Sequence, residues 1–223
     1  MPSLLFSIPV HEAPETVVNQ VEVIRAFVPG AAVVINAVND EPGFHAALAA
    51  RFGAELGKSV LLNIAPRLSR LGAHVLNFQF ARERINFDYI VLEASNSLPV
   101  RGGAAEYAAH FDAGIPRWQL NLDLPIWANE RLRSDCYLAS YGYPHLYAAQ
   151  CEGSFYRREL FGQVIERLRT GYDDEKWCPE EVLPATILFN EFQGLKLGNP
   201  ITYVFWERPD YRVTVQDVDA LRG

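Results

Sequence analysis

Short apolar runs alternate with amphipathic segments through the first half of the chain, and this alternation constrains the fold more than any other feature. Residues 4–10 and 31–38 predict two buried strands. Residues 14–28 between them keep valine and isoleucine at helical spacing, which predicts a helix with Gln20 on its outer, polar face. Strand, helix and strand joined by short connections form the βαβ unit of a parallel sheet. The sequence therefore predicts an α/β domain with a mostly parallel central sheet flanked by helices.

The same alternation continues after the second strand. Further helices are predicted at residues 44–56 and from Leu68, and further strands at residues 59–64 and 87–101, the last with its exit loop. Ligands of such sheets bind beyond the carboxyl ends of the strands. His11 and Asn36 stand at the ends of the first two strands, so both are expected at that edge. A histidine at a strand end is also common as a loop or helix-capping residue.

Residues 176–190, KWCPEEVLPATILFN, place two adjacent carboxylates at the start of another predicted helix. Pro179 suits the first helical turn, and Glu180 and Glu181 then fall within it. Two interpretations are open: the macrodipole stabilises acidic residues at a helix N-terminus, or one of the pair performs acid–base chemistry. Pro184 removes a helical hydrogen bond, so a short or bent helix is expected.

The composition fits one globular domain with a sizeable core, since 49% of the 223 residues are hydrophobic and 21% are charged. A net charge of −7 without basic runs argues against a nucleic-acid partner. Cys136, Cys151 and Cys178 lack metal-site spacing, so reduced thiols in a cytoplasmic protein are expected. The first residues resemble neither a signal peptide nor a transmembrane segment. No Asp-x-Asp ends an early strand, so no metal or other cofactor is expected.

Residues 178–187, CPEEVLPATI, resemble the Pro-Asp-Glu-x-Leu-Trp-Ala-Thr-Ile stretch of the core 2/I-branching β-1,6-N-acetylglucosaminyltransferases. In that family the Glu of the Asp-Glu pair is the catalytic base, and its position here is Glu181. Residues 152–168, EGSFYRRELFGQVIERL, are similar to the family's Gly-Ser-x-Tyr-Phe-x-x-Ser-Arg-Glu-Tyr-Val region. The resemblance also gives Glu152 a role near the acceptor. Because a helix N-terminus weakens a carboxylate base, burial or neighbouring charges are expected to offset that effect at Glu181.

The start of the chain resembles the donor-binding side of the same family. Residues 6–27 are similar to its opening strand and helix, which begin Ser-Ile-x-Val-His, and His11 matches the motif histidine. The next family signature, Ile-His-Val-Asp-Arg-Lys, is replaced by INAVNDE, in which Asn36 stands in the corresponding polar place. The resemblance therefore implies donor contacts by His11 and Asn36.

Two more blocks extend this similarity. Residues 67–77 resemble the segment that carries Trp-Ser-Arg-Val, which makes Arg70 a donor-side candidate, with an ordinary exposed helix arginine as the alternative. Residues 87–101 look like Tyr-Leu-Ile-x-Leu-x-Gly-x-Asp-Phe-Pro-Ile, with Ser97 in place of the aspartate. A carboxylate contact of the family is therefore replaced by a hydroxyl contact at Ser97.

The last third of the chain carries the remaining similarity. The tail is expected to form a strand, a loop and a helix from about Thr214, with Arg212 where the family has an arginine near the donor diphosphate. The family's second cation has no counterpart before Gly223. Aromatic residues are frequent between positions 102 and 150, and they fit either sugar stacking or a core of large side chains.

The resemblance implies a single GT-A-like domain, with residues 1–100 as the nucleotide-sugar-binding half and residues 101–223 as the acceptor and catalytic half. The implied activity is an inverting, metal-independent transfer of a sugar, with N-acetylglucosamine as a candidate, from a nucleoside-diphosphate sugar to a carbohydrate hydroxyl. The alternative is a catalytically silent sugar- or nucleotide-binding protein of the same fold.

Overall fold

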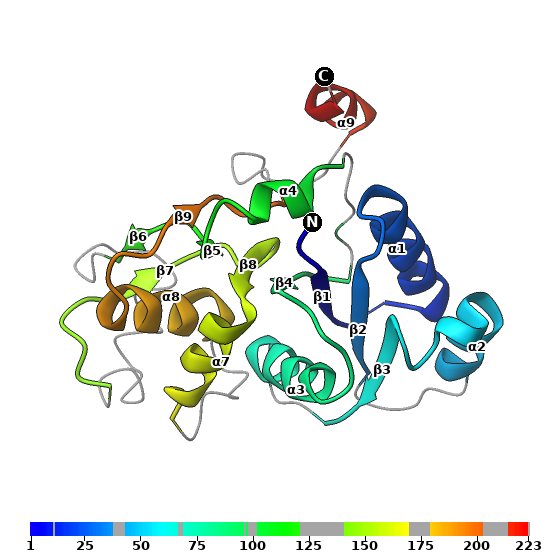
Figure 1. Cartoon of the computed structure of the whole chain (residues 1–223), viewed down its shortest axis with the longest axis horizontal. Coiled ribbons are helices and arrows are strands. Elements are labelled where there is room, and N and C mark those ends of the chain that lie inside the picture. The colour runs from blue at the N-terminus through cyan, green and yellow to red at the C-terminus, as the bar shows by residue number, and fades with distance from the viewer. Residues whose placement is uncertain are drawn as a thin grey trace.

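The computed structural model describes residues 1–10, 12–37, 43–66, 69–95, 97, 102–120, 141–169, 179–202 and 214–222. Within these ranges the chain forms a central sheet with helices on both faces (Figure 1). No helix in the described ranges is both long and apolar enough to cross a membrane.

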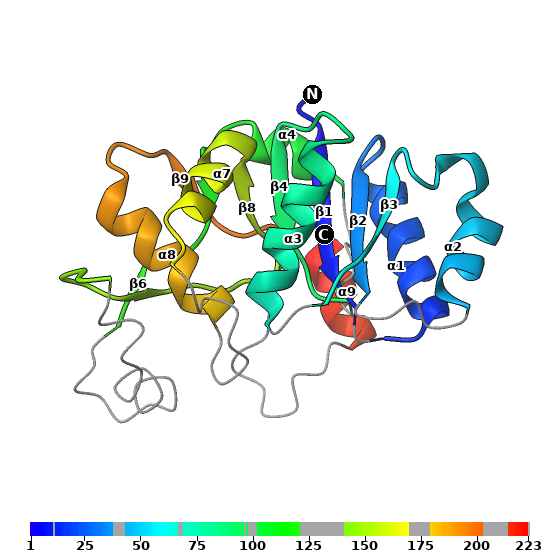
Figure 2. The same cartoon turned by 90° about the horizontal axis from the view of Figure 1, so that it is seen from below.

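Four parallel strands make up one part of the main sheet: β1 (Leu4–Pro9), β2 (Ala32–Ala37), β3 (Val60–Ile64) and β4 (Tyr89–Leu92). The other part consists of β8 (Ser154–Arg157), which runs antiparallel to β4, followed by β5 (Ala113–Gly114) and β9 (Leu197–Gly198). The strand order is β3-β2-β1-β4-β8-β5-β9, and Figure 2 shows the run from β3 through β2, β1 and β4 to β8. A separate small sheet pairs β6 (Trp118–Gln119) with β7 (Tyr147–Ala148).

Helices cover both faces of the main sheet. One face packs against α1 (Pro14–Phe27), α2 (Phe44–Phe52) and α4 (Ala104–Ala108), and a 3-10 turn (Gly53–Glu55) follows α2. The other face packs against α3 (Arg70–Arg82), α7 (Arg158–Glu166) and α8 (Pro179–Glu191). The last helix, α9 (Val215–Arg222), stands apart from the other elements in Figure 1.

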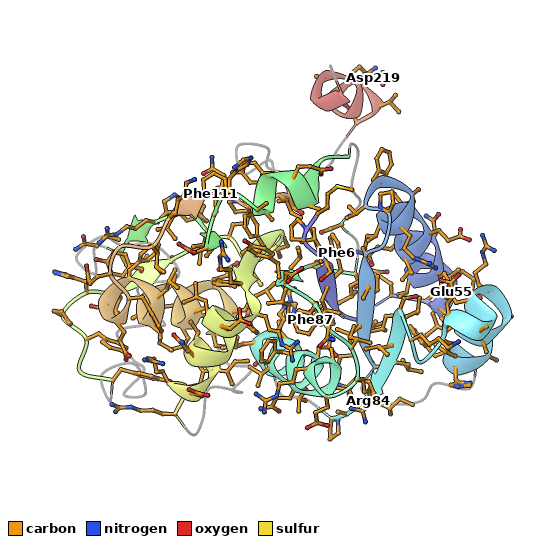
Figure 3. The ribbon with its side chains drawn as sticks, in the orientation of Figure 1. Phe6, Glu55, Arg84, Phe87, Phe111 and Asp219 are labelled. Carbon is orange, nitrogen blue, oxygen red and sulfur yellow. The ribbon has the colours of Figure 1, made fainter. Side chains whose placement is uncertain are left out.

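Alternation along each strand divides the core between these two faces. Leu4, Phe6 and Ile8 of β1 belong to the cluster under α1 and α2, whereas Leu5 belongs to the cluster under α3. Phe6 and Phe87, which belong to opposite clusters, are both labelled in Figure 3. A strand buried on both faces is nearly all apolar, which explains why the first strands were visible in the sequence.

The predicted strands and helices of the first half are confirmed, but the predicted position of Gln20 is wrong. Gln20 is only 1% exposed. Its side-chain amide donates hydrogen bonds to the carbonyl oxygens of Ala94 and Ser97, both at 2.7 Å. The glutamine therefore faces the sheet because it satisfies the backbone that leaves β4.

Two further elements differ from the prediction in the second half. The helix that starts at Pro179 was expected to be short or bent, and it is not short, because α8 continues through Pro184 for 13 residues. Burial of Leu183, Ile187 and Leu188 in the core offsets the hydrogen bond that the proline removes. Strand β8 was not predicted at all. The strand expected in the tail lies largely in residues 203–213, outside the described residues.

Candidate functional site

Five segments meet at one edge of the main sheet. The parallel strands β1 to β4 all end at this edge, and the antiparallel β8 begins there. A cavity of about 210 Å³ lies at this position. Its lining residues come from the ends of β1 and β4, the first turns of α3 and the approach to β8: Pro9, Glu12, Arg70, His74, Glu93, Ala94, Ser95, Cys151 and Glu152.

Arg70 is the basic centre of this edge. It opens α3, directly after Ser69, whose hydroxyl caps the helix by accepting the N–H of Gly72 at 3.0 Å. The Nη1 atom of Arg70 lies 3.8 Å from Oε1 of Glu152 and 3.9 Å from Oε1 of Glu180. A cation at a helix N-terminus opposes the macrodipole, so these two carboxylates compensate an unfavourable position.

The carboxylates at the start of α8 differ in burial and lie close to Arg70. The Glu180 side chain is only 4% exposed, and Glu181 is partly buried. Burial, together with the neighbouring charges of Glu180 and Glu152, raises the pKa of Glu181 to about 7, and Arg70 opposes this shift. Burial also raises the pKa of Glu180. The expected offset of the helix dipole is thus confirmed, and Glu181 can take up a proton near neutral pH.

Glu93 brings another carboxylate to the cavity from the end of β4. It is 6% exposed, and the Thr202 hydroxyl donates a hydrogen bond to its Oε1 atom. The Oε2 atom has no hydrogen-bond partner within the described part of the chain. Burial raises the pKa of Glu93 to about 7, although the hydroxyls of Thr202 and Ser97 act in the opposite direction. A buried carboxyl with only one hydrogen-bonded oxygen costs folding free energy, so its presence calls for an explanation.

A chain of polar side chains runs through the core behind the cavity. Asn77 donates to the Ser7 hydroxyl at 3.0 Å, and Ser7 is hydrogen-bonded to Nδ1 of His74 at 2.8 Å. Nε2 of His74 lies 3.8 Å from the Cys151 sulfur. Burial raises the pKa of the Cys151 thiol well above its usual value, so this sulfur is a neutral packing group. Both ring nitrogens of His74 are thus engaged inside the protein.

The structure brings together three of the predicted site residues: Arg70, Glu152 and Glu181 all lie in one electrostatic cluster. Ser97 lies close enough to lower the pKa of Glu93, so it also belongs to this edge. Asn36 is fully buried, and its amide nitrogen donates to the carbonyl oxygens of Asn63 and Ala65 at 3.3 and 3.2 Å. It lies one residue before the end of β2, at the expected edge, but is bonded within the sheet.

Two predicted donor contacts lie outside the described residues. These are the contacts of His11 and Arg212. Two of the three cysteines, Cys136 and Cys178, also lie outside the described residues. Their predicted roles therefore stay predictions.

Three residues of the site were missed in the sequence: Glu93, His74 and Thr202. For Glu93 a signal existed, because a carboxylate directly follows the apolar run of β4, where ligands of parallel sheets bind. No local pattern identifies Thr202, which reaches Glu93 from 109 positions away.

The described carboxylates do not form a ready metal centre. Among these residues, no group of three or more His, Cys, Asp or Glu side chains is placed to hold a metal ion. The oxygens of Glu152 and Glu180 face Arg70, and one oxygen of Glu93 accepts from Thr202. These carboxylates are instead arranged to accept hydrogen bonds from a positively charged group or from N–H groups.

The fold resembles that of solved transferases. The mannosyltransferase PcManGT from Pyrobaculum calidifontis, solved with GDP-Man and Mn2+, superimposes with a TM-score of 0.53 at 13% identity over 89% of this chain and 54% of its own. The present chain thus spans about half the length of that enzyme. No protein-family model and no curated protein matches the sequence.

Two other solved structures show weaker similarity. A 4-diphosphocytidyl-2C-methyl-D-erythritol synthase gives a TM-score of 0.48 at 10% identity, over 100% of this chain and 97% of its own. Residues 1–349 of TarS from S. aureus give 0.47 at 7% identity, over 89% and 60%. The similarity to the mannosyltransferase therefore shows a GT-A-like fold, with a mostly parallel sheet flanked by helices.

Proposed function

We propose that this chain is an inverting, metal-independent glycosyltransferase that moves a sugar, with N-acetylglucosamine as the first candidate, from a nucleoside-diphosphate sugar to a carbohydrate hydroxyl. The observation that carries the proposal is the meeting of Glu181, Arg70 and Glu152 at the carboxyl edge of a GT-A-like sheet. These residues come from three separate segments, each of which resembles the core 2/I-branching enzymes.

Glu181 is the base in the proposed reaction. Its carboxylate takes the proton from the acceptor hydroxyl while that oxygen attacks the anomeric carbon of the donor. The bond from the anomeric carbon to the diphosphate oxygen breaks on the opposite side, and the diphosphate leaves with the electron pair. A pKa of about 7 makes Glu181 a stronger base than an exposed glutamate and leaves it about half ionised at neutral pH.

The remaining residues bind the two substrates. Arg212, Arg70 and helix N-termini stabilise the charge of the leaving diphosphate, and no metal ion is required. His11 and Ser97 contact the donor, and Glu152 contacts the acceptor; Asn36 is left out because its amide is bonded within the sheet.

A silent binding protein of the same fold is the second candidate. One observation favours it: the Asn36 amide is committed to carbonyl oxygens inside the sheet rather than open to a donor. In this case the site binds a sugar or nucleotide without turnover.

A nucleotide-sugar panel separates the two candidates. Each donor is screened by thermal shift, since a ligand that binds the folded state raises its melting temperature. Donors that give a shift are then tested for turnover with carbohydrate acceptors. Transfer with inverted stereochemistry supports the enzyme, a shift without turnover supports the binding protein, and no shift with any donor contradicts both.

A further inference from the structure

We propose that the cavity at the carboxyl edge of the sheet binds a protonated amine, so that the acceptor of this protein is an amine-bearing carbohydrate such as an amino sugar. This inference rests on the proposed function, because it assigns the chemistry of the acceptor at the same site. It follows from the charge and the open hydrogen-bonding capacity of the residues that line the cavity.

The cavity carries a surplus of negative charge. Three carboxylates line it, Glu12, Glu93 and Glu152, against the single guanidinium of Arg70. Arg70 is in addition shared with Glu180, which lies 3.9 Å away and is almost fully buried. His74 also lines the cavity, but both its ring nitrogens are engaged with Ser7 and Cys151. The described groups therefore leave the carboxylates short of positive charge.

Glu93 points to the kind of group that fills this deficit. Only 6% of the Glu93 surface is exposed, and its Oε2 atom lacks a hydrogen-bond partner among the described residues. Thr202 already donates to the other oxygen. In its ionised form this oxygen only accepts hydrogen bonds, so the partner of the ionised group is a hydrogen-bond donor. An ammonium group supplies N–H donors and positive charge together, whereas a sugar hydroxyl supplies only the donor.

The size of the cavity fits one substituent rather than a whole substrate. Pockets that enclose drug-sized ligands span roughly 300–1,000 Å³. The present cavity measures about 210 Å³, so it holds one group of an acceptor whose remaining part extends outward. Glu152, which also lines the cavity, is the carboxylate with a predicted acceptor contact.

Two sugars that differ only at one nitrogen test the inference. D-glucosamine and N-acetyl-D-glucosamine are titrated into the full chain at about pH 7, where an amine is largely protonated. Binding is measured by calorimetry in a buffer without amines. We expect glucosamine to bind at least about tenfold more tightly, and Glu93→Gln to remove most of this preference. Glu106→Gln, an exposed change of equal charge on α4, should leave the preference intact.

Each other outcome overturns the inference. Equal binding of the two sugars, or a preference that survives Glu93→Gln, excludes an amine at this carboxyl. Binding of MnCl₂ alone that depends on Glu93, without a preference for glucosamine, assigns the cavity to a metal ion. The unaltered chain alone shows whether glucosamine binds more tightly than N-acetylglucosamine, so the inference can be overturned even if the Glu93→Gln variant folds poorly.

The donor panel keeps this inference separate from the proposed function. Nucleotide-sugar binding without an amine preference removes only the amine subsite. An amine preference without any nucleotide-sugar binding removes the transferase proposal and leaves the subsite standing.

Discussion

The backbone N–H of Ala149 donates a hydrogen bond of 2.7 Å to the carbonyl oxygen of Glu181. Two more hydrogen bonds join the same segments, because the Thr186 hydroxyl accepts from the N–H of Tyr147 at 2.9 Å and lies 3.1 Å from its carbonyl oxygen. The first two turns of α8 are thus fastened to β7 and the residues after it. First turns of helices normally fray, so this attachment holds the backbone of Glu181 in a defined position.

Glu181→Gln tests the proposed base. The amide keeps the size of the side chain but cannot accept the proton, so sugar transfer should fall by roughly a hundredfold or more while donor affinity stays near wild type. Glu180→Gln is the matched control at the adjacent position. Because the pKa of both carboxyls is raised, a neutral amide at either position should cost at most about 1 kcal/mol of stability. Equal rates in the two variants would return Glu181 to a purely structural role.

Arg70→Gln tests the electrostatic coupling of the site through a pH profile. Arg70 lowers the pKa of Glu181, so its removal should move that pKa above about 7. Since the base acts when ionised, the acidic limb of the kcat profile should move to higher pH. Arg70→Lys keeps the charge and should restore the limb. A limb that stays in place in Arg70→Gln would show that the guanidinium does not act on the base.

Removal of divalent ions should leave both donor binding and transfer unchanged. The reason is that the diphosphate charge is assigned to arginine side chains and helix N-termini. The measurement is turnover after dialysis against EDTA, with and without added manganese. Loss of activity that manganese restores would disprove metal independence.

Glu93→Gln should make stability less dependent on pH. The fold raises the Glu93 pKa from 4.5 to about 7, so its ionised form is disfavoured in the native state. The penalty is absent below about pH 4.5 and complete above about pH 7, which lowers the free energy of unfolding by on the order of 3 kcal/mol across that window. The variant lacks this loss but still accepts from Thr202. The free energy of unfolding, measured in urea at about pH 5 and about pH 8, should therefore rise in the variant relative to wild type at the higher pH.

The exposed Glu106→Gln is the control for that measurement. It removes the same charge outside the cavity, so its stability relative to wild type should be nearly the same at the two pH values. A parallel pH dependence in Glu93→Gln and wild type would contradict the burial of an ionisable carboxyl at this position.

Gly153→Ala should disrupt the support of the cavity. Gly153 has a φ of +74°, and a Cβ atom there would lie 2.3 Å from the Cβ of Thr202. Gly142 has a φ of +66° but open space around the same position. Gly142→Ala should therefore cost about 1–2 kcal/mol from the left-handed backbone alone. Gly153→Ala should cost clearly more, because Thr202 must also move. Similar unfolding free energies in the two variants would show that Thr202 moves away from the added Cβ atom without a measurable loss of stability.

The elements that could be predicted are those whose sequence pattern lies within the element itself. In β1, α1 and β2 the apolar side chains recur at the spacing of the element itself, and Pro29 and Gly30 mark the end of the helix. Strand β8 could not be recognised in the same way. Its four residues lead into α7 without a break, since Arg157 ends the strand and Arg158 starts the helix. The interior position of β8 depends on its pairing with β4 and β5, which no local sequence pattern contains.

The same distinction separates the site residues. Glu181 could be singled out because a helix start and a family resemblance coincide at one position. Gln20 was misplaced because its polarity suggested solvent, whereas its amide is needed by the carbonyl oxygens of Ala94 and Ser97. Glu93 was missed although it directly follows the apolar run of β4, because its burial and its hydrogen bond with Thr202 arise only in the tertiary structure.

The hydrogen bond between Thr202 and Glu93 spans 109 positions, and it has a consequence for how the protein folds. Contacts between distant positions form late, after the loop between them has lost its conformational freedom. Strands β1 to β3 with their helices can assemble from neighbouring segments, but the cavity needs β8, the start of α8 and residue 202 in place as well. The cavity is thus completed at the end of folding, and a nascent chain carries most of its sheet before this cavity exists.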